Sequence, residues 1–153
     1  MSEKRFIGLD LAFANNGVVI LDEEGNIIHQ EVLSTSKKDP DEVRLINIRT
    51  KLNSLLQDND IVCLEGLSFG SQGMSLAQLG AVHYITRVLL YERNIDFSLV
   101  TPSTLKKFVT GKGNCKKDLI LLKVFQKWGV EFSNDNLADA YSLARFALNN
   151  YTD

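Results

Sequence analysis

The first third of the chain alternates apolar blocks with polar turns in a way that predicts three strands. Residues 6–11 form a short apolar run that contains one carboxylate, and residues 17–21 form a second, β-branched run. Residues 22–26 have the composition of a turn, after which residues 27–33 alternate between apolar and polar side chains. We therefore expect a three-stranded antiparallel meander.

A helix is predicted after the meander. Asp39 is placed as its N-cap, Pro40 as its first helical residue, and Glu42 as the partner that closes a capping box. The apolar residues that follow keep helical spacing to about residue 57; they are Leu45, Ile48, Leu52, Leu55 and Leu56.

Two further strands enclose a long helix. Residues 61–64 are entirely apolar, as in a strand that is buried on both faces of a sheet. A glycine-rich loop over residues 66–73 leads into a helix that ends near residue 93. Residues 97–100 are the fifth predicted strand.

Three helices are predicted to complete the chain. Thr101 and Pro102 open the first, and Gly111 closes it. The second covers residues 116–128 and ends at Gly129, and the last covers about residues 134–148. This order of elements indicates an α/β fold, in which one mixed sheet has helices on both faces. We expect residues 1–153 to form a single domain.

Three acids interrupt segments that are otherwise suited to burial. Asp10 lies in the first apolar strand, Glu65 follows the fourth, and Asp139 lies in an alanine-rich helical segment. A single buried acid is explained by an ion pair or a helix cap, but three at one sheet end would raise one another's pKa unless a cation neutralised them. Oxygen ligands of this kind suit Mg²⁺ or Mn²⁺, and two such ions roughly 4 Å apart activate water and stabilise a leaving oxygen.

Five blocks of the sequence carry a family resemblance. In order they are residues 6–10, 62–65, 100–106, 111–117 and 136–140. They resemble successive blocks of the RuvC Holliday-junction resolvases, which belong to the RNase H-like superfamily, and the short, lysine-rich form is similar to the bacteriophage branch. The resemblance implies an RNase H-like fold, with a five-stranded mixed sheet of three antiparallel and two parallel strands flanked by helices on both faces.

The resemblance also implies an activity and a site. It implies an Mg²⁺-dependent endodeoxyribonuclease, with Mn²⁺ as a possible substitute and two ions per active site. Such an enzyme resolves Holliday junctions or other branched DNA by phosphodiester hydrolysis and leaves 5′-phosphate and 3′-hydroxyl ends. Asp10, Glu65 and Asp139 would be metal ligands. The family usually has a fourth carboxylate at the position of Asn136 here, so either the Asn136 carbonyl or, as a second choice, Asp135 would complete the set.

Two other functions remain open. The loss of a carboxylate at Asn136 is also compatible with a catalytically weakened protein that only binds branched DNA. A sugar-kinase-like ATP-binding domain shares this topology, but it would need a second comparable domain and glycine-rich phosphate loops, and neither is seen in these 153 residues.

Charge is distributed unevenly along the chain. The net charge is −2, which alone argues mildly against nucleic-acid binding. However, seven lysines and one aspartate give residues 104–127 a charge of +6, so the remainder carries −8. Two helices with solvated lysine faces would also explain this segment. By resemblance, Lys117 stabilises transition-state charge and Lys106 holds the scissile phosphate, and the further DNA-binding candidates are Lys107, Lys112 and Lys116.

The glycine-rich loop contains one aromatic residue, Phe69. Beside an active site, an exposed phenylalanine can stack on an unpaired base at a junction. The alternative is a side chain that folds back onto the core. The family resemblance favours the DNA-binding interpretation.

The long helix predicts a homodimer. The segment 76–91 has only one charged residue and needs burial on two sides. We expect one side on the sheet and the other, with Ala77, Gly80, Ala81 and Tyr84, against a second copy; burial under the C-terminal helix is the alternative. No apolar run approaches the 18 or so residues of a membrane span, so we expect a cytoplasmic protein, in the host cell if phage-encoded.

Overall fold

The computed structural model describes residues 3–67 and 74–151, and it contains one five-stranded sheet. The strands are β1 (Phe6–Asp10), β2 (Asn15–Leu21), β3 (Ile27–Ser34), β4 (Ile61–Glu65) and β5 (Asp96–Val100). Their order across the sheet is β3-β2-β1-β4-β5, with β1, β2 and β3 antiparallel and β1, β4 and β5 parallel. The predicted meander and the mixed sheet are confirmed.

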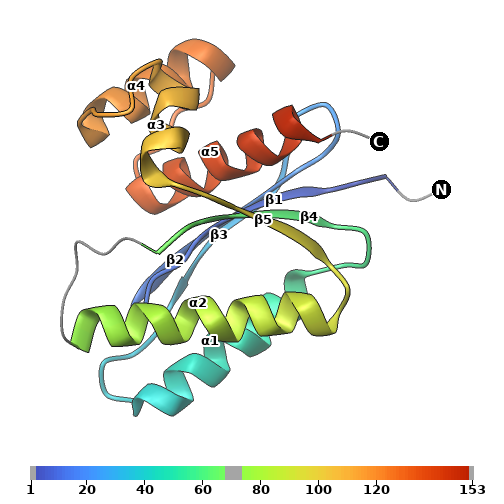
Figure 1. Ribbon diagram of the computed structural model, residues 1–153, viewed down its shortest axis with the longest axis vertical. Coiled ribbons are helices and arrows are strands. Elements are labelled where there is room, and N and C mark those ends of the chain that lie inside the picture. Colours follow the sequence, from blue (N-terminus) through green and yellow to red (C-terminus); the bar gives the residue numbers. More distant parts are fainter. Residues whose placement is uncertain (1–2, 68–73, 152–153) are drawn as a thin grey trace.

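Helices cover both faces of this sheet, as Figure 1 shows. On one face lie α1 (Asp41–Leu55) and α2 (Met74–Glu92). On the other lie α3 (Pro102–Thr110), α4 (Lys117–Trp128) and α5 (Asp135–Asn150). The α/β fold class is confirmed. The suggestion that the long helix is buried under the C-terminal helix is wrong, because the sheet separates α2 from α5.

Alternation along the central strand divides the core into two layers. In β1, Ile7 and Leu9 pack with α1 and α2, whereas Phe6 packs with the α5 side. Strand β4 lies between β1 and β5 and is buried on both faces, with Val62, Cys63 and Leu64 fully inaccessible. The apolar composition of these two strands is therefore explained by helices on both sides.

Two glycines let α5 lie unusually close to the sheet. A Cβ atom on Gly8 of β1 would overlap the carbonyl group of Ala140, and one on Gly17 of β2 would overlap that of Asn136. Both overlaps involve helix backbone, which cannot move aside as a flexible side chain can. The first half of α5 is therefore held directly over β1 and β2.

The start of α1 differs from the prediction. Pro40, not Asp39, is the N-cap, and no side chain caps the helix. Pro40 has an extended ψ of 154°, so the helix begins at Asp41, and the amide of Arg44 donates to the Pro40 carbonyl oxygen. Asp39 instead closes a turn through its amide and the carbonyl of Ser36, which leaves the capping box unformed.

The boundaries of α3 and α4 agree with the prediction. The Thr101 hydroxyl accepts a hydrogen bond from the amide of Thr104 and caps α3. Gly111 ends α3 with a φ of 84°, and Gly129 ends α4 with a φ of 69°, both left-handed conformations that favour glycine. Among the described residues, no helix is long and apolar enough to cross a membrane.

Candidate active site

The first two acids lie at one edge of the sheet because their strands are parallel neighbours. Asp10 ends β1 and Glu65 ends β4, and the register pairs Leu9 with Leu64 immediately before them. The carboxyl ends of adjacent parallel strands meet at the same sheet edge. The third acid, Asp139, reaches this edge from α5.

The position of Asp139 is set by a capped helix start and by the glycine contacts. The Asn134 side-chain oxygen accepts hydrogen bonds from the amides of Asn136 at 2.8 Å and Leu137 at 3.2 Å. These bonds fix the first turn of α5. Asp139 immediately precedes Ala140, whose carbonyl lies against Gly8 of β1, so its backbone is held beside the strand that carries Asp10.

Electrostatics show that the three carboxyl groups are neighbours. Burial, together with the negative charges of Asp139 and Glu65, raises the pKa of Asp10 to about 8, against the opposing effect of Lys117. Burial also raises the pKa of Glu65, again with a contribution from Asp139. The pKa of Asp139 is raised by burial, while Lys117 and Lys106 lower it. The structure thus brings together the three predicted acids and both predicted catalytic lysines.

The acids are not already arranged around a common point. Within residues 3–67 and 74–151, no group of three or more His, Cys, Asp or Glu side chains has the arrangement of a metal site. Like charges in a partly buried setting repel, and a cation between them would relieve that repulsion. Carboxylate oxygens are the ligands that Mg²⁺ and Mn²⁺ prefer, so the donor set fits such an ion.

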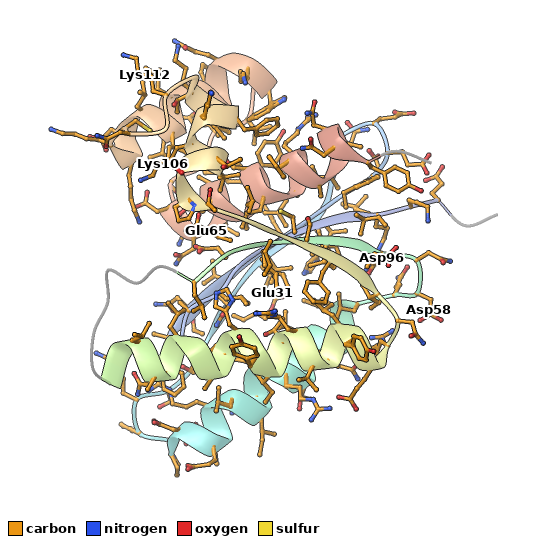
Figure 2. The ribbon with its side chains drawn as sticks, in the orientation of Figure 1. Glu31, Asp58, Glu65, Asp96, Lys106 and Lys112 are labelled. Atoms are coloured by element: carbon orange, nitrogen blue, oxygen red, sulfur yellow. The ribbon has the colours of Figure 1, made fainter. Side chains whose placement is uncertain are left out.

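The other predicted residues differ in how close they lie to the acids. Lys106, on α3, is half-buried, and Figure 2 shows it near Glu65. Lys112 lies farther out, at the end of α3 that points away from the sheet. Lys107 and Lys116 are exposed on the same layer of helices. Phe69 lies outside the described residues, so its placement as a wedge stays a prediction.

Two residues of α5, Asn136 and Asp135, are candidates for the fourth metal ligand. Asn136 is half-buried in the first turn of α5, above Gly17. Asp135 is exposed, but its charge raises the pKa of Asp139, which places it within electrostatic reach of the site. Both residues stay candidates.

Sequence reasoning missed a polar network that supports the segment after Asp10. The Asn16 side chain is fully buried; its oxygen accepts from the amide of Ala12 at 2.8 Å, and its nitrogen donates to the Leu33 carbonyl at 3.4 Å. The buried guanidinium of Arg44 donates to the Phe13 carbonyl and stacks on its ring at 4.1 Å. The available signal was a polar residue, Asn16, at the start of an apolar strand.

The raised pKa of Asp10 predicts how metal-free stability depends on pH. Because the folded-state pKa is about 8, against an ordinary 3.8, folding favours the protonated acid. The contribution of protonated Asp10 to the free energy of unfolding is fully present below about pH 4, and it is lost as the pH rises through 8. In EDTA, Asp10→Asn should therefore raise the melting temperature at pH 8.5 and change it little at pH 4. The expected rise is roughly 2–4 °C for each kcal/mol of burial cost and charge repulsion that the substitution removes.

Asp96→Asn is the control, because Asp96 is exposed and lies at the opposite end of the strands (Figure 2). Equal effects of the two variants at pH 8.5 would contradict the prediction.

Comparisons with known proteins place the chain in a family. Residues 6–145 match the family model described as crossover junction endodeoxyribonuclease RuvC. A protein of that name from Petrotoga mobilis is 30% identical over 145 residues, covering 90% of this chain and 89% of the relative. Another, from Brachyspira hyodysenteriae, is 24% identical over 143 residues, with the same coverage.

Solved structures share the fold. Thermus thermophilus RuvC has a TM-score of 0.79 and 23% identity, covering 94% of this chain and 91% of the other. The fowlpox virus Holliday junction resolvase has a TM-score of 0.63 and 13% identity, covering 98% and 100%. With the family model spanning nearly the whole chain, the protein belongs to the RuvC family of crossover junction endodeoxyribonucleases.

Proposed function

We propose that this protein cuts Holliday junctions and other branched DNA by divalent-metal-dependent phosphodiester hydrolysis, leaving 5′-phosphate and 3′-hydroxyl ends. The observation that carries the proposal is the meeting of Asp10, Glu65 and Asp139 at one sheet edge, within electrostatic reach of Lys106 and Lys117. Its relatives are named as crossover junction endodeoxyribonucleases, and a Thermus thermophilus relative of the same fold was solved with a Holliday junction substrate.

The residues divide the work between metal binding and phosphate binding. Asp10, Glu65 and Asp139 supply carboxylate oxygens for two Mg²⁺ or Mn²⁺ ions. These residues would hold the ions, whose chemistry there would be Lewis acidity and the activation of water for hydrolysis. Lys117, exposed at the first residue of α4, offers its charge to the phosphate in the transition state, and Lys106 holds the phosphate from α3.

The exposed lysines beyond the site extend the phosphate-binding surface. Lys107, Lys112 and Lys116 carry no acid partner in the ion pairs of the described residues. They would contact the DNA backbone without selecting bases. Phe69 is proposed to stack on an unpaired base at the branch point.

A homodimer is proposed through the outward side of α2. Large apolar side chains are exposed there, namely Tyr84 at 56%, Val88 at 51% and Tyr91 at 80%. Burying such a surface in a two-fold contact would stabilise a dimer. Two active sites related by a two-fold axis suit a four-way junction, whose resolution needs two symmetric cuts.

The dimer predicts the effect of a charge on this surface. Val88→Asp should convert the protein to a monomer in sedimentation velocity runs and reduce paired cutting of a junction, because a buried unpaired carboxylate is costly. Ile46→Asp, at a 58% exposed position on α1, is the matched control and should change neither property. A wild-type protein that sediments as a monomer at micromolar concentration would contradict the dimer.

Asn136→Asp tests the fourth ligand. The change adds a charged oxygen to a site that already holds three carboxylates, so it should lower the Mg²⁺ concentration for half-maximal cleavage. The same charge increases repulsion without metal, so the melting temperature in EDTA should fall. If the Mg²⁺ requirement and the melting temperature in EDTA both stay unchanged, Asn136 lies outside the metal site. The same two measurements on Asp135→Asn then test Asp135 as the fourth ligand.

The proposed function is tested with a substrate panel. Labelled four-way junction, flap and linear duplex DNA are incubated with the protein in Mg²⁺ or EDTA. We expect cuts in the junction only with Mg²⁺, and little cutting of the duplex. Tight junction binding without any cut in Mg²⁺ or Mn²⁺ would favour the alternative, a protein that binds branched DNA and has lost catalysis.

A further inference from the structure

A cavity of about 310 Å³ lies apart from the carboxylates, between the ends of α3 and α4 and the later turns of α5. Two of the side chains that line it are cationic. Its wall combines aromatic rings, two cations, an aliphatic side chain and an amide; the residues are Phe108, Lys127, Trp128, Arg145, Leu148 and Asn149.

Lys127 is held in this cavity by an aromatic pair and a carbonyl. Its Nζ donates to the Phe108 carbonyl oxygen at 2.7 Å. The same nitrogen lies 5.3 Å from the ring centroids of Phe108 and of Trp128. The ammonium is thus fixed in position while the residue remains exposed to solvent.

Arg145 brings a second cation to the same indole. Its guanidinium carbon lies 5.3 Å from the Trp128 ring centroid. Its Nε donates to the Tyr141 hydroxyl at 2.9 Å, and a terminal nitrogen donates to the Gly25 carbonyl at 3.2 Å. The rings and carbonyls therefore orient both Lys127 and Arg145.

Neither cation has a neutralising acid. Among the ion pairs of residues 3–67 and 74–151, none joins Lys127 or Arg145 to a carboxylate. Two positive charges near one aromatic ring repel each other, and an anion bound in the cavity that they line would offset that repulsion.

We propose that this cavity binds a phosphate of the DNA backbone at a distance from the scissile bond. The inference rests on the proposed function, since it places the ligand on the same DNA. Lys117 at the site and Lys127 at the cavity are ten residues apart on α4, a rise of about 15 Å. A duplex whose axis runs along α4 advances about 3.4 Å per nucleotide on each strand, so in this arrangement the contacted phosphate lies about four nucleotides from the cut.

The test uses a lysine whose loss leaves the active site intact. Lys127→Gln removes the charge, and Lys127→Arg keeps it. Lys4→Gln is the matched control, because Lys4 also lies over an aromatic ring, that of Tyr151 at 5.6 Å, but is not one of the residues that line the cavity. Junction affinity is measured as a function of salt concentration. We expect Lys127→Gln to lower the slope of log affinity against log salt by about 0.9, with Lys127→Arg and Lys4→Gln unchanged.

Two further measurements locate the contact. Trp128 is the only tryptophan of the chain, so intrinsic tryptophan fluorescence reports on this cavity alone and should change when junction DNA binds. Junctions carrying one neutral methylphosphonate each are then scanned. One position, about four nucleotides from the cut, should weaken binding of the wild type and have no effect on Lys127→Gln.

The outcomes separate this site from the proposed function. If the wild type binds and cuts the junction, yet the Lys127→Gln slope and the tryptophan emission are unaltered, the cavity does not bind DNA phosphate. A weaker Lys127→Gln affinity with an unchanged slope would also overturn the proposal, because it indicates lost packing rather than a lost phosphate contact. If the wild type binds no branched DNA at all, the proposed function itself fails.

Discussion

Glu65→Gln is expected to lower the rate of junction cleavage by at least about 10²–10³-fold while junction binding stays the same or tightens. The substitution keeps the shape of the side chain and removes the charge that a divalent ion needs from its ligand. Binding should not weaken, because a negative charge beside the DNA phosphate is also removed. Single-turnover cleavage and gel-shift affinity, measured on the same preparation, give the two quantities.

Glu31→Gln is the matched control for this experiment. Glu31 is half-buried on β3, where it pairs with His29 and Lys51 (Figure 2). Its loss should alter stability slightly and leave cleavage near the wild-type rate. If Glu65→Gln cuts as fast as Glu31→Gln, Glu65 is not a metal ligand.

Gly8→Ala is expected to destabilise the protein by about 1–3 kcal/mol or more and to reduce cleavage sharply. The added Cβ would overlap the Ala140 carbonyl and lie 2.5 Å from the Ala144 nitrogen, both in the backbone of α5. The helix must therefore shift away from β1 as a unit. Because Asp139 is carried by the same turn, the shift also separates it from Asp10.

Urea unfolding and single-turnover cleavage measure the two effects of Gly8→Ala. Gly80→Ala on α2 is the control for a clash within one subunit, because no atom from another element of the same chain lies within 4 Å of an added Cβ there. In a helix interior that change should stabilise by up to about 1 kcal/mol. Wild-type stability and activity in Gly8→Ala would mean that α5 does not need its close approach to the sheet.

The sequence predicted most element boundaries because they depend on local chemistry. Thr101 at the start of α3, and Gly111 and Gly129 at the ends of α3 and α4, act within a few residues of their own positions. The start of α1 was placed one residue early because Pro40 is compatible with both the cap and the first helical position.

The acids of the site were also visible in the sequence, since each interrupts an apolar run. Their supports were not visible, because they depend on contacts between distant segments. Gly8 and Gly17 matter only because α5 crosses them, and Arg44 becomes a buried cation only because the segment around Phe13 folds onto it. The single domain, the bacteriophage affinity and the cytoplasmic location stay predictions.

Metal-directed cleavage of the polypeptide tests the metal site most directly. Fe²⁺ replaces Mg²⁺ at oxygen-rich sites, and with ascorbate and peroxide it cuts the backbone close to where it is bound. We predict fragments that end near Asp10, Glu65 and Asp139, suppressed by excess Mg²⁺ and absent in Glu65→Gln. Fragments that map elsewhere, or that persist unchanged in Glu65→Gln, would contradict a divalent metal site at the carboxyl ends of β1 and β4.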